Sequence, residues 1–255
     1  MVAILWQMMG QLVDQVLPSL NALRESVGAR RFERGMDYIR ASSGLLYYTA
    51  KPFEYPRNPW PEHVRLVEPG IWKPISADKL PERNGTRPHI LVTTSTEFQN
   101  DGRLIETAIE ALGNAPYDIT ITTGAVDPDS FAAPAGIRIV RYAPHGAILR
   151  EAACVVCHGG MDITQKALGL GVPVCAVPFG RDQFEVGQHI VAARAGVSLS
   201  AFKLTAEALR DAIEQTIAAK PDASRIADAF RHSGDAHAAA NEIEHLIPTA
   251  THATV

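Results

Sequence analysis

The residues best suited to a chemical role lie between Cys154 and Gln183. A short apolar run at residues 154–157 predicts a buried strand, and residues 161–169 have a pattern typical of a helix. Between them, His158-Gly159-Gly160 predicts a turn that lets the backbone bend sharply and approach a ligand. The first N–H groups of a helix have no partner inside it and point toward such a turn. The segment therefore predicts a site for an anion the size of a phosphate.

The same segment continues into a second group of polar residues. The helix is expected to end at Gly169-Leu170-Gly171, and residues 172–177 predict another apolar strand. The polar loop that follows Pro178 contains Asp182 and Gln183. Residues 154–183 are therefore expected to form one βαβ unit, with an anion site at the first strand end and a carboxylate–carboxamide pair at the second.

Regular alternation of strands and helices begins at residue 89 and predicts an α/β fold with a doubly wound parallel sheet. Such a sheet binds its ligands outside the carboxyl ends of its strands. Four segments with ligand-type side chains follow predicted strands: Ser95-Thr96, Tyr142, His158 and Asp182. Strands are expected at residues 89–94, 117–122, 137–141, 154–157, 172–177 and 196–199, and helices at 101–112, 146–152, 161–169, 184–195, 205–218 and 222–246.

The chain before residue 89 has a different character. Residues 1–41 carry two helical patterns, and residues 44–50 predict a strand. Residues 59–88 are rich in proline, glycine and charge and predict an interdomain linker. We therefore expect residues 1–58 to belong to a first domain, residues 89–247 to form the ligand-binding domain, and residues 248–255 to be a flexible tail.

The whole chain has 255 residues and a formal net charge of −4. It has no broad basic field, which argues against a nucleic-acid partner, because such binding depends on neutralising phosphates. No stretch reaches the roughly 18 uninterrupted apolar residues of a membrane span. Residues 1–9 lack the basic lead of a signal peptide. We therefore expect a cytoplasmic protein whose partner is a small molecule.

Three cysteines, Cys154, Cys157 and Cys175, fall within predicted core strands, and their odd number argues against a disulfide framework. Residues 154–158 match the C-x-x-C-H pattern of covalent haem attachment. A strand, however, sends residues three apart to opposite faces, so we expect buried structural cysteines instead. The nine histidines show no spacing typical of metal ligands.

The order of features in residues 154–183 resembles the nucleotide-sugar signature of a known family. The order is His-Gly-Gly, a helix with Ala-Leu, Gly-Val-Pro, an apolar strand, Pro and Asp-Gln. It is similar to that of the two-domain inverting glycosyltransferases of macrolide and plant natural products, and it is more specific than a lone glycine-rich turn. The resemblance covers residues 32–247. It implies the GT-B architecture, with residues 89–247 as the Rossmann-like donor half and residues 1–58 as a remnant of the N-terminal acceptor domain.

The resemblance also implies roles for residues at the sheet edge. Tyr142 and His145 stand where plant relatives have a tryptophan that stacks on the base and a glutamine. His158 stands where the family places an imidazole that contacts the diphosphate. The turn at Gly159 and Gly160, with the backbone N–H groups beyond it, would complete the anion site.

Further positions complete the donor site that the resemblance implies. Asp182 and Gln183 stand where the family holds the hexose hydroxyls. Ser95 and Thr96 follow the first strand of the domain and would add hydroxyl donors near the phosphates. Thr164, in the helix after the glycine turn, would do the same.

Three residues of that helix depart from the family pattern. Asp162 stands where relatives have Gly or Asn close to phosphate, and its carboxylate would repel an anion. Ile163 replaces a hydroxyl-bearing residue. Lys166 replaces a glutamate that holds the ribose hydroxyls in plant members, so no nucleotide preference follows. Asp127-Pro128-Asp129 imitates the D-x-D metal motif of another transferase architecture, but it lies in a loop without the matching context.

The resemblance implies a hexosyltransferase that uses a UDP- or TDP-sugar as donor substrate, with no cofactor and no metal, and acts on a small-molecule hydroxyl with inversion. In the family the general base is a histidine near the start of the acceptor domain, which this chain does not contain, so the catalytic base is unknown. Two interpretations stay open. One is a transferase whose acceptor half is truncated or comes from another chain, and the other is a non-enzymatic remnant or partner subunit. We expect self-association or an acceptor-domain chain as partner.

Overall fold

The structure, a computed structural model, describes residues 8, 10–57, 59–70, 87–95 and 101–246. Contacts divide the chain into two compact units. The larger consists of Tyr47–Trp60 and Leu66–Asn241, and the smaller of Met1–Leu46, Pro61–Arg65 and Glu242–Val255.

The larger unit is built on six parallel strands: β3 (His89–Thr93), β4 (Asp118–Thr122), β5 (Ile137–Val140), β6 (Ala152–Cys157), β7 (Val174–Ala176) and β8 (Gly196–Ser198). They lie in the order β5-β4-β3-β6-β7-β8. From β3 the chain moves outward to β4 and β5, crosses back to β6, and then moves outward on the other side. The predicted doubly wound parallel sheet is confirmed, and its strand order reverses between β3 and β6.

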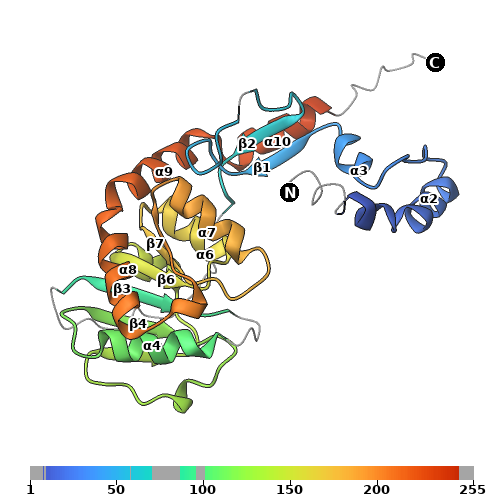
Figure 1. The fold of residues 1–255 in the computed structure, drawn as a ribbon. Helices are drawn as coiled ribbons and strands as arrows, with labels where there is room; N and C mark the ends of the chain where they lie inside the picture. Colours follow the sequence, from blue (N-terminus) through green and yellow to red (C-terminus); the bar gives the residue numbers. More distant parts are fainter. Residues whose placement is uncertain (1–7, 9, 58, 71–86, 96–100, 247–255) are drawn as a thin grey trace. The chain divides into compact units, whose positions relative to one another are not determined.

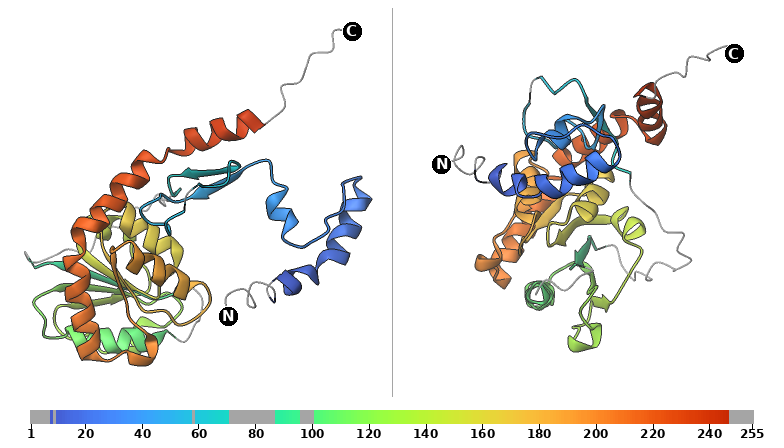
Figure 2. Two further views of the ribbon diagram at one scale, coloured as in Figure 1. Left: turned by 45° about the horizontal axis from the view of Figure 1, so that its top comes forward. Right: turned by 90° about the vertical axis from the view of Figure 1, so that its right-hand side faces the viewer.

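Helices cover both faces of this sheet (Figures 1 and 2). Leu91 and Val155 pack in a core with one group of helices, whereas Ile90 and Val156 pack in a core with another. This division follows from the alternation of side chains along a strand. The first group is α5 (His145–Leu149), α6 (Met161–Gly169), α7 (Gln183–Ala192) and α9 (Lys220–His232), and the second is α4 (Gly102–Leu112) and α8 (Ala206–Ala218).

The cysteines are buried and free, as expected. Cys154 packs in the core with α4 and α8, whereas Cys157 packs in the opposite core. Burial raises the pKa of the Cys157 thiol to about 11 and that of Cys175 to about 12, and it also raises the pKa of Cys154. These thiols therefore stay protonated and act as apolar core residues.

Two helices differ from those expected. The helix expected at residues 146–152 ends at Leu149, because Ala152 already belongs to β6 and pairs with His89. The helical region expected at residues 222–246 is divided into α9 and α10 (Ala236–Leu246). Gly234 lies between them with a φ of 95°, which ends the first helix. Short 3₁₀ turns occur at Pro128–Ser130 (η1) and Ala201–Lys203 (η2).

Contacts group the segment Tyr47–Trp60 with the sheet. The expected first domain at residues 1–58 and linker at residues 59–88 stay predictions. Phe53 is 1% exposed and meets Phe230 edge-on, with ring centroids 6.0 Å apart. Nδ1 of His189 lies 3.0 Å from the carbonyl oxygen of Phe53 and donates to it, since a carbonyl only accepts. The ring of Tyr55 lies 4.2 Å from that of His189. These contacts fasten the segment to α7 and α9.

Two short strands, β1 (Leu45–Tyr48) and β2 (Val64–Val67), form a two-stranded sheet. β1 was expected, whereas the strand β2 was not; it lies within residues 59–88, whose role as a linker stays a prediction. Val67 is 3% exposed, so this strand buries an apolar side chain. The strand has only four residues, which is too short for its sequence pattern to reveal it. Residues 71–86 of the expected linker and the expected tail at 248–255 lie outside the described residues.

The smaller unit contains α2 (Leu17–Ser26) and α3 (Asp37–Arg40). None of its described hydrophobic side chains is buried; its two buried residues in the described part are Asn21 and Gly35. The side-chain amide of Asn21 donates to the carbonyl of Phe32 at 3.0 Å, and the N–H of Phe32 donates back to it at 2.8 Å. In its described part, this unit is therefore held by polar contacts.

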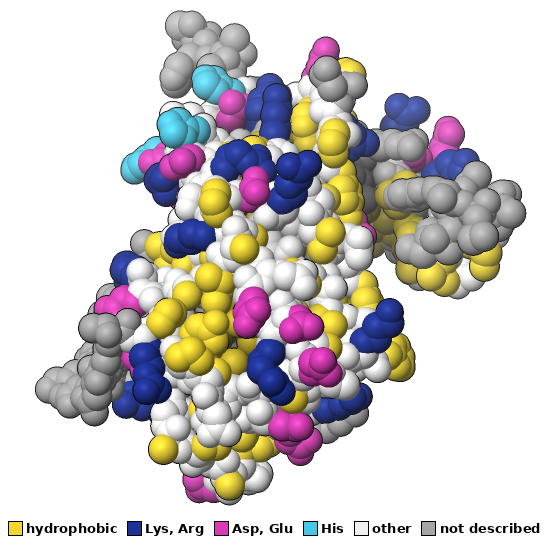
Figure 3. Space-filling model, turned by 60° about the vertical axis from the view of Figure 1, so that its left-hand side comes forward, with side chains coloured by type: hydrophobic (Ala, Val, Ile, Leu, Met, Phe, Trp, Pro, Cys, Tyr) yellow, Lys and Arg dark blue, Asp and Glu magenta, His cyan; other side chains and the backbone are white. Residues whose placement is uncertain are grey.

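The face shown in Figure 3 carries basic and acidic side chains interspersed with one another. Such a mixture presents no extended field of one sign on this face. Within the described residues, every helix is too short or too polar to span a lipid bilayer.

Candidate functional site

Ser95 and His158 leave neighbouring strands at the point where the strand order reverses. Thr93 of β3 pairs with Cys157 of β6, so the segments that follow start about 4.8 Å apart, the spacing of paired strands. Ser95 is buried, and its N–H donates to Oδ2 of Asp101 over 2.7 Å. Thr96 lies outside the described residues. A switch point of this kind is where open α/β sheets bind ligands.

The imidazole of His158 occupies the space next to Gly160. A Cβ on residue 160 would lie 2.5 Å from Nε2 of His158. Gly160 has an ordinary φ of −66°, so glycine is needed here for space and not for conformation. Gly159, in contrast, has a φ of 85°, and a Cβ there would lie 3.2 Å from the carbonyl oxygen of Gln183. Gly159 therefore makes the turn, and Gly160 makes room for the ring.

The charge state of His158 is set by opposing effects. Burial lowers the pKa of its imidazole, while the carboxylates of Asp101 and Asp182 raise it. Nδ1 is buried and has no hydrogen-bond partner in the described part of the chain. The ring is therefore neutral at pH 7, and two acidic groups favour its charged form.

His145 is held by a chain of hydroxyl groups. Thr122 Oγ1 donates to Thr93 Oγ1 at 2.8 Å, so it accepts from Nε2–H of His145 at 3.0 Å. This assigns the proton to Nε2 and leaves Nδ1 as an acceptor. Burial, followed by the charge of Lys166, lowers the pKa of His145 to about 4, although Asp162 acts in the opposite direction. The ring is neutral at pH 7, and it lies within electrostatic reach of α6.

The N-terminus of α6 keeps its anion-binding groups. Thr164 makes the first backbone bond of the helix, to the carbonyl of Gly160 at 3.1 Å, so the N–H groups of residues 161–163 precede the ladder. No side chain caps this end. Asp162 does not stand alone there, because Nζ of Lys166 lies 2.6 Å from its Oδ2. The repulsion expected from Asp162 is therefore partly offset by a neighbouring cation.

Two predicted site residues are buried away from solvent. Thr164 is 0% exposed, and it lies beside the Cys157 thiol, whose pKa it helps to lower against the effect of burial. Gln183 is 2% exposed, and its Oε1 accepts from the N–H groups of Phe179 and Gly180 at 2.8 and 3.1 Å. The structure thus gives Gln183 a part in shaping the loop before α7. Its role towards a hexose stays a prediction.

Two others are open to solvent at the same edge. Tyr142 follows β5 and is 67% exposed, so its ring is available for stacking. Asp182 is exposed at the start of α7 and makes no capping hydrogen bond. Together with Ser95, His145 and His158, these residues all follow strands of one sheet at its carboxyl edge.

Sequence reasoning missed three residues of this site: Asp101, Thr122 and Thr93. Asp101 was expected only as the start of a helix, whereas its side chain bonds Ser95 and acts on His158. The sequence did offer a signal for Asp101: it is an aspartate at the start of the predicted helix that follows the first strand of the donor domain. Nothing in the sequence pairs Thr122 with His145, because the two lie on separate elements.

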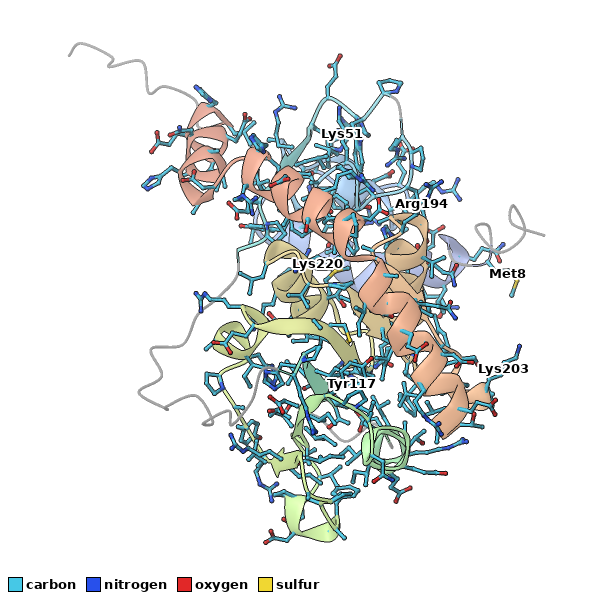
Figure 4. All side chains as sticks on the ribbon, turned by 90° about the vertical axis from the view of Figure 1, so that its left-hand side faces the viewer. Met8, Lys51, Tyr117, Arg194, Lys203 and Lys220 are labelled. Carbon is cyan, nitrogen blue, oxygen red and sulfur yellow. The ribbon has the colours of Figure 1, made fainter. Side chains whose placement is uncertain are left out.

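No group of three or more His, Cys, Asp or Glu side chains in the described ranges is arranged to hold a metal ion. A cleft of about 390 Å³ lies elsewhere, between the end of α4, the start of β4 and α8. Its wall includes Tyr117, labelled in Figure 4, which directly precedes β4, so the cleft lies at the amino edge of the sheet. It is separate from the carboxyl edge, where the polar residues gather.

Residues 106–246 match the family described as Erythromycin biosynthesis protein CIII-like, C-terminal domain. The chain belongs to this family of natural-product glycosyltransferases. It is 30% identical over 222 residues to 4'-demethylrebeccamycin synthase of Lentzea aerocolonigenes, which covers 81% of this chain and 52% of that protein. The chain therefore spans about half the length of that relative.

Solved structures show the same fold. The glycotransferase of kitacinnamycin superposes with a TM-score of 0.82 at 20% identity, over 93% of this chain and 65% of that one. The glycosyltransferase VinC, solved in complex with dTDP, gives a TM-score of 0.72 at 20% identity, over 91% of this chain and 58% of that one. The expected GT-B architecture is confirmed.

Proposed function

We propose that this glycosyltransferase chain is a donor half that binds a nucleoside diphosphate sugar, with UDP or TDP as the nucleotide, along the carboxyl edge of its sheet. The observation that carries the proposal is the anion site at the turn between β6 and α6. There His158 lies over Gly160, next to uncapped N–H groups of a helix. The dTDP complex of VinC, a protein of the same fold, supports the nucleotide class.

The other residues of the edge suit the remaining parts of such a ligand. The exposed ring of Tyr142 offers a stacking surface for a base, and Nδ1 of His145 offers an acceptor near it. Asp182 is exposed and offers carboxylate oxygens to sugar hydroxyls. Ser95 lies beside the phosphate site. Thr164 and Gln183 are buried, so we assign them a structural part in shaping this edge of the sheet.

The proposed reaction is metal-independent hexosyl transfer with inversion. An acceptor hydroxyl loses its proton to a base, and its oxygen attacks the anomeric carbon from the face opposite the nucleotide. The bond to the diphosphate then breaks, and the diphosphate leaves with the electron pair. His158 and the N–H groups of α6 stabilise the charge that develops on the leaving group. We assign no base to the described part of this chain.

The acceptor side of the reaction is proposed to lie outside the described units. The smaller unit exposes the apolar side chains of Leu12, Val16, Leu23 and Val27, and none of its described apolar side chains is buried. A surface of this kind suits contact with another protein surface. We infer that it contacts an acceptor-binding half or a second copy of the chain. The same observation favours the second candidate function, a non-enzymatic partner subunit.

Calorimetric titration with UDP and dTDP tests the donor site. We expect measurable heat and a rise in melting temperature, because a ligand at about 100 times its Kd adds roughly 2.7 kcal/mol to stability. If neither nucleotide binds at millimolar concentration, the donor-site assignment is wrong. Single-turnover sugar transfer by the chain separates the two candidates, since a partner subunit binds without transferring.

A further inference from the structure

Asp101 is a buried carboxylate at the edge of the proposed donor site. It is 2% exposed and directly precedes α4. Aspartate at this place usually caps its helix, but the side chain of Asp101 makes no capping bond. Its Oδ2 instead accepts from the N–H of Ser95 at 2.7 Å. A buried carboxylate with so few donors is costly unless a positive charge lies nearby.

The imidazole of His158 is placed to supply that charge. Ser95 and His158 follow paired strands, so Asp101, which is bonded to Ser95, lies next to the segment that carries His158. The Asp101 carboxylate raises the pKa of His158 against the lowering effect of burial. Nδ1 of the ring is buried without a partner in the described part of the chain. Within the described residues, the Ser95 N–H is the one donor that contacts the side chain of Asp101, and Nδ1 of His158 has no partner.

Two acidic groups face His158 from neighbouring elements. Asp101 comes from the start of α4 and Asp182 from the loop before α7. Arg181, next to Asp182, is exposed. Asp162 and Lys166, on α6, are paired with each other. Asp182 is exposed and therefore screened by water, whereas Asp101 is buried and its charge is screened less.

We propose that Asp101 is a positioning residue for His158, and that its charge lets the imidazole take up one proton from solvent when a diphosphate binds. This inference deepens the proposed donor site and rests on it. Without ligand, burial keeps the ring neutral. A bound diphosphate adds negative charge and favours the imidazolium, which has two N–H donors. One N–H donates to a phosphate oxygen of the ligand, and the other faces the carboxylate of Asp101.

The first test titrates the His158 ring by NMR in the ligand-free chain. Asp101→Asn keeps an oxygen that accepts from Ser95 but removes the charge, so we expect the pKa of His158 to fall further below its ordinary value. Asp211→Asn, an exposed aspartate of α8, is the matched control and should leave it unchanged. The same His158 pKa in the wild type and in Asp101→Asn would overturn the proposal.

The second test measures proton uptake during UDP binding, by calorimetry in buffers with different ionisation enthalpies between pH 6.5 and 7.5. The wild-type chain should take up protons on binding UDP. Its affinity for UDP should therefore fall by up to about tenfold for each unit by which the pH rises. Asp101→Asn should take up fewer protons and show a shallower pH dependence. UDP binding without proton uptake in the wild type contradicts this inference alone. Absence of UDP and dTDP binding contradicts the proposed function, and the ring titration then decides the role of Asp101.

Discussion

Lys166 and Asp162 form an ion pair across one turn of α6, with Nζ 2.6 Å from Oδ2. Asp162 lies in the first turn of α6, where the proposed diphosphate would bind, and both charges act on His145. Lys166 is mostly buried, with its side chain 18% exposed, whereas the side chain of Asp162 is 78% exposed. The carboxylate thus engages the cation that could otherwise interact with a ligand.

Asp162→Gly should raise affinity for UDP or dTDP by roughly tenfold, about 1.4 kcal/mol. The substitution removes a negative charge at the helix N-terminus and releases Lys166. Calorimetric titration measures the change. Asp222→Gly removes a similarly paired aspartate from the first turn of α9 and serves as the control. Unchanged affinity in Asp162→Gly would mean that its carboxylate points away from the phosphates.

Gly160→Ala should weaken nucleotide binding by about tenfold or more, the range expected when a hydrogen bond to a charged group is lost. The new Cβ would need the space of His158 Nε2, and the ring, as the end of a side chain, should move aside. The melting temperature should change little. Gly102→Ala, where a Cβ meets nothing within 4 Å, is the matched control. Full affinity in Gly160→Ala would show that His158 does not contact the diphosphate.

Tyr142→Ala should reduce affinity for UDP and dTDP, because base–aromatic stacking contributes about 1–3 kcal/mol. Tyr142→Phe keeps the stacking face and should bind nearly as well as the wild type. Tyr38→Ala removes another exposed tyrosine, in the smaller unit, and should have no effect on affinity. Equal binding by Tyr142→Ala and the wild type would place the base elsewhere.

Acid should destabilise the fold in part through His145. Its folded pKa of about 4 lies below the ordinary value of 6.5, so the unfolded chain binds the extra proton first. The free energy of unfolding should therefore fall as the pH drops from about 6.5 to about 4, and His158 acts in the same direction. In His145→Gln, whose amide N–H can still donate to Thr122, urea unfolding should depend less steeply on pH. His237→Gln, at an exposed site, should retain the wild-type slope.

The chain should self-associate through the exposed apolar side chains of its smaller unit. Leu23 and Val27 are 64% and 72% exposed, and both lie at the C-terminal end of α2. Leu23→Glu combined with Val16→Glu should lower the mass measured by light scattering at a given concentration. Ala22→Glu, at an exposed position of the same helix, is the control. A monodisperse monomer in the wild type would contradict the prediction.

If the partner of the smaller unit is an acceptor-binding half, adding that half as a separate chain should have two effects. It should suppress self-association, because it covers the same side chains, and it should allow multiple-turnover transfer, because we expect the general base to lie on that half. Transfer to a small phenolic or macrolide acceptor by the chain alone would contradict this assignment and require a base within the chain.

The sequence by itself determined the order of strands and helices and the edge at which polar residues gather. Apolar runs such as residues 154–157, the glycine turn after them and the regular β/α spacing are local patterns. Local patterns specify elements, and the preference for parallel strands with right-handed crossovers then leaves few arrangements. For that reason the doubly wound sheet and the place of His158 were predictable before any contact was known.

Only the tertiary structure decided the contacts between segments far apart in the chain. His145 and Thr122 are 23 residues apart, and His189 and Phe53 are 136 apart. Such pairs depend on strand register and helix packing, which sequence patterns do not record. The same holds for two further contacts, which sequence patterns also do not record. They are the buried hydrogen bond from Ser95 to Asp101 and the position of the His158 ring over Gly160. Burial and close approach, which set the charge of both histidines, exist only once the sheet has brought its strand ends together.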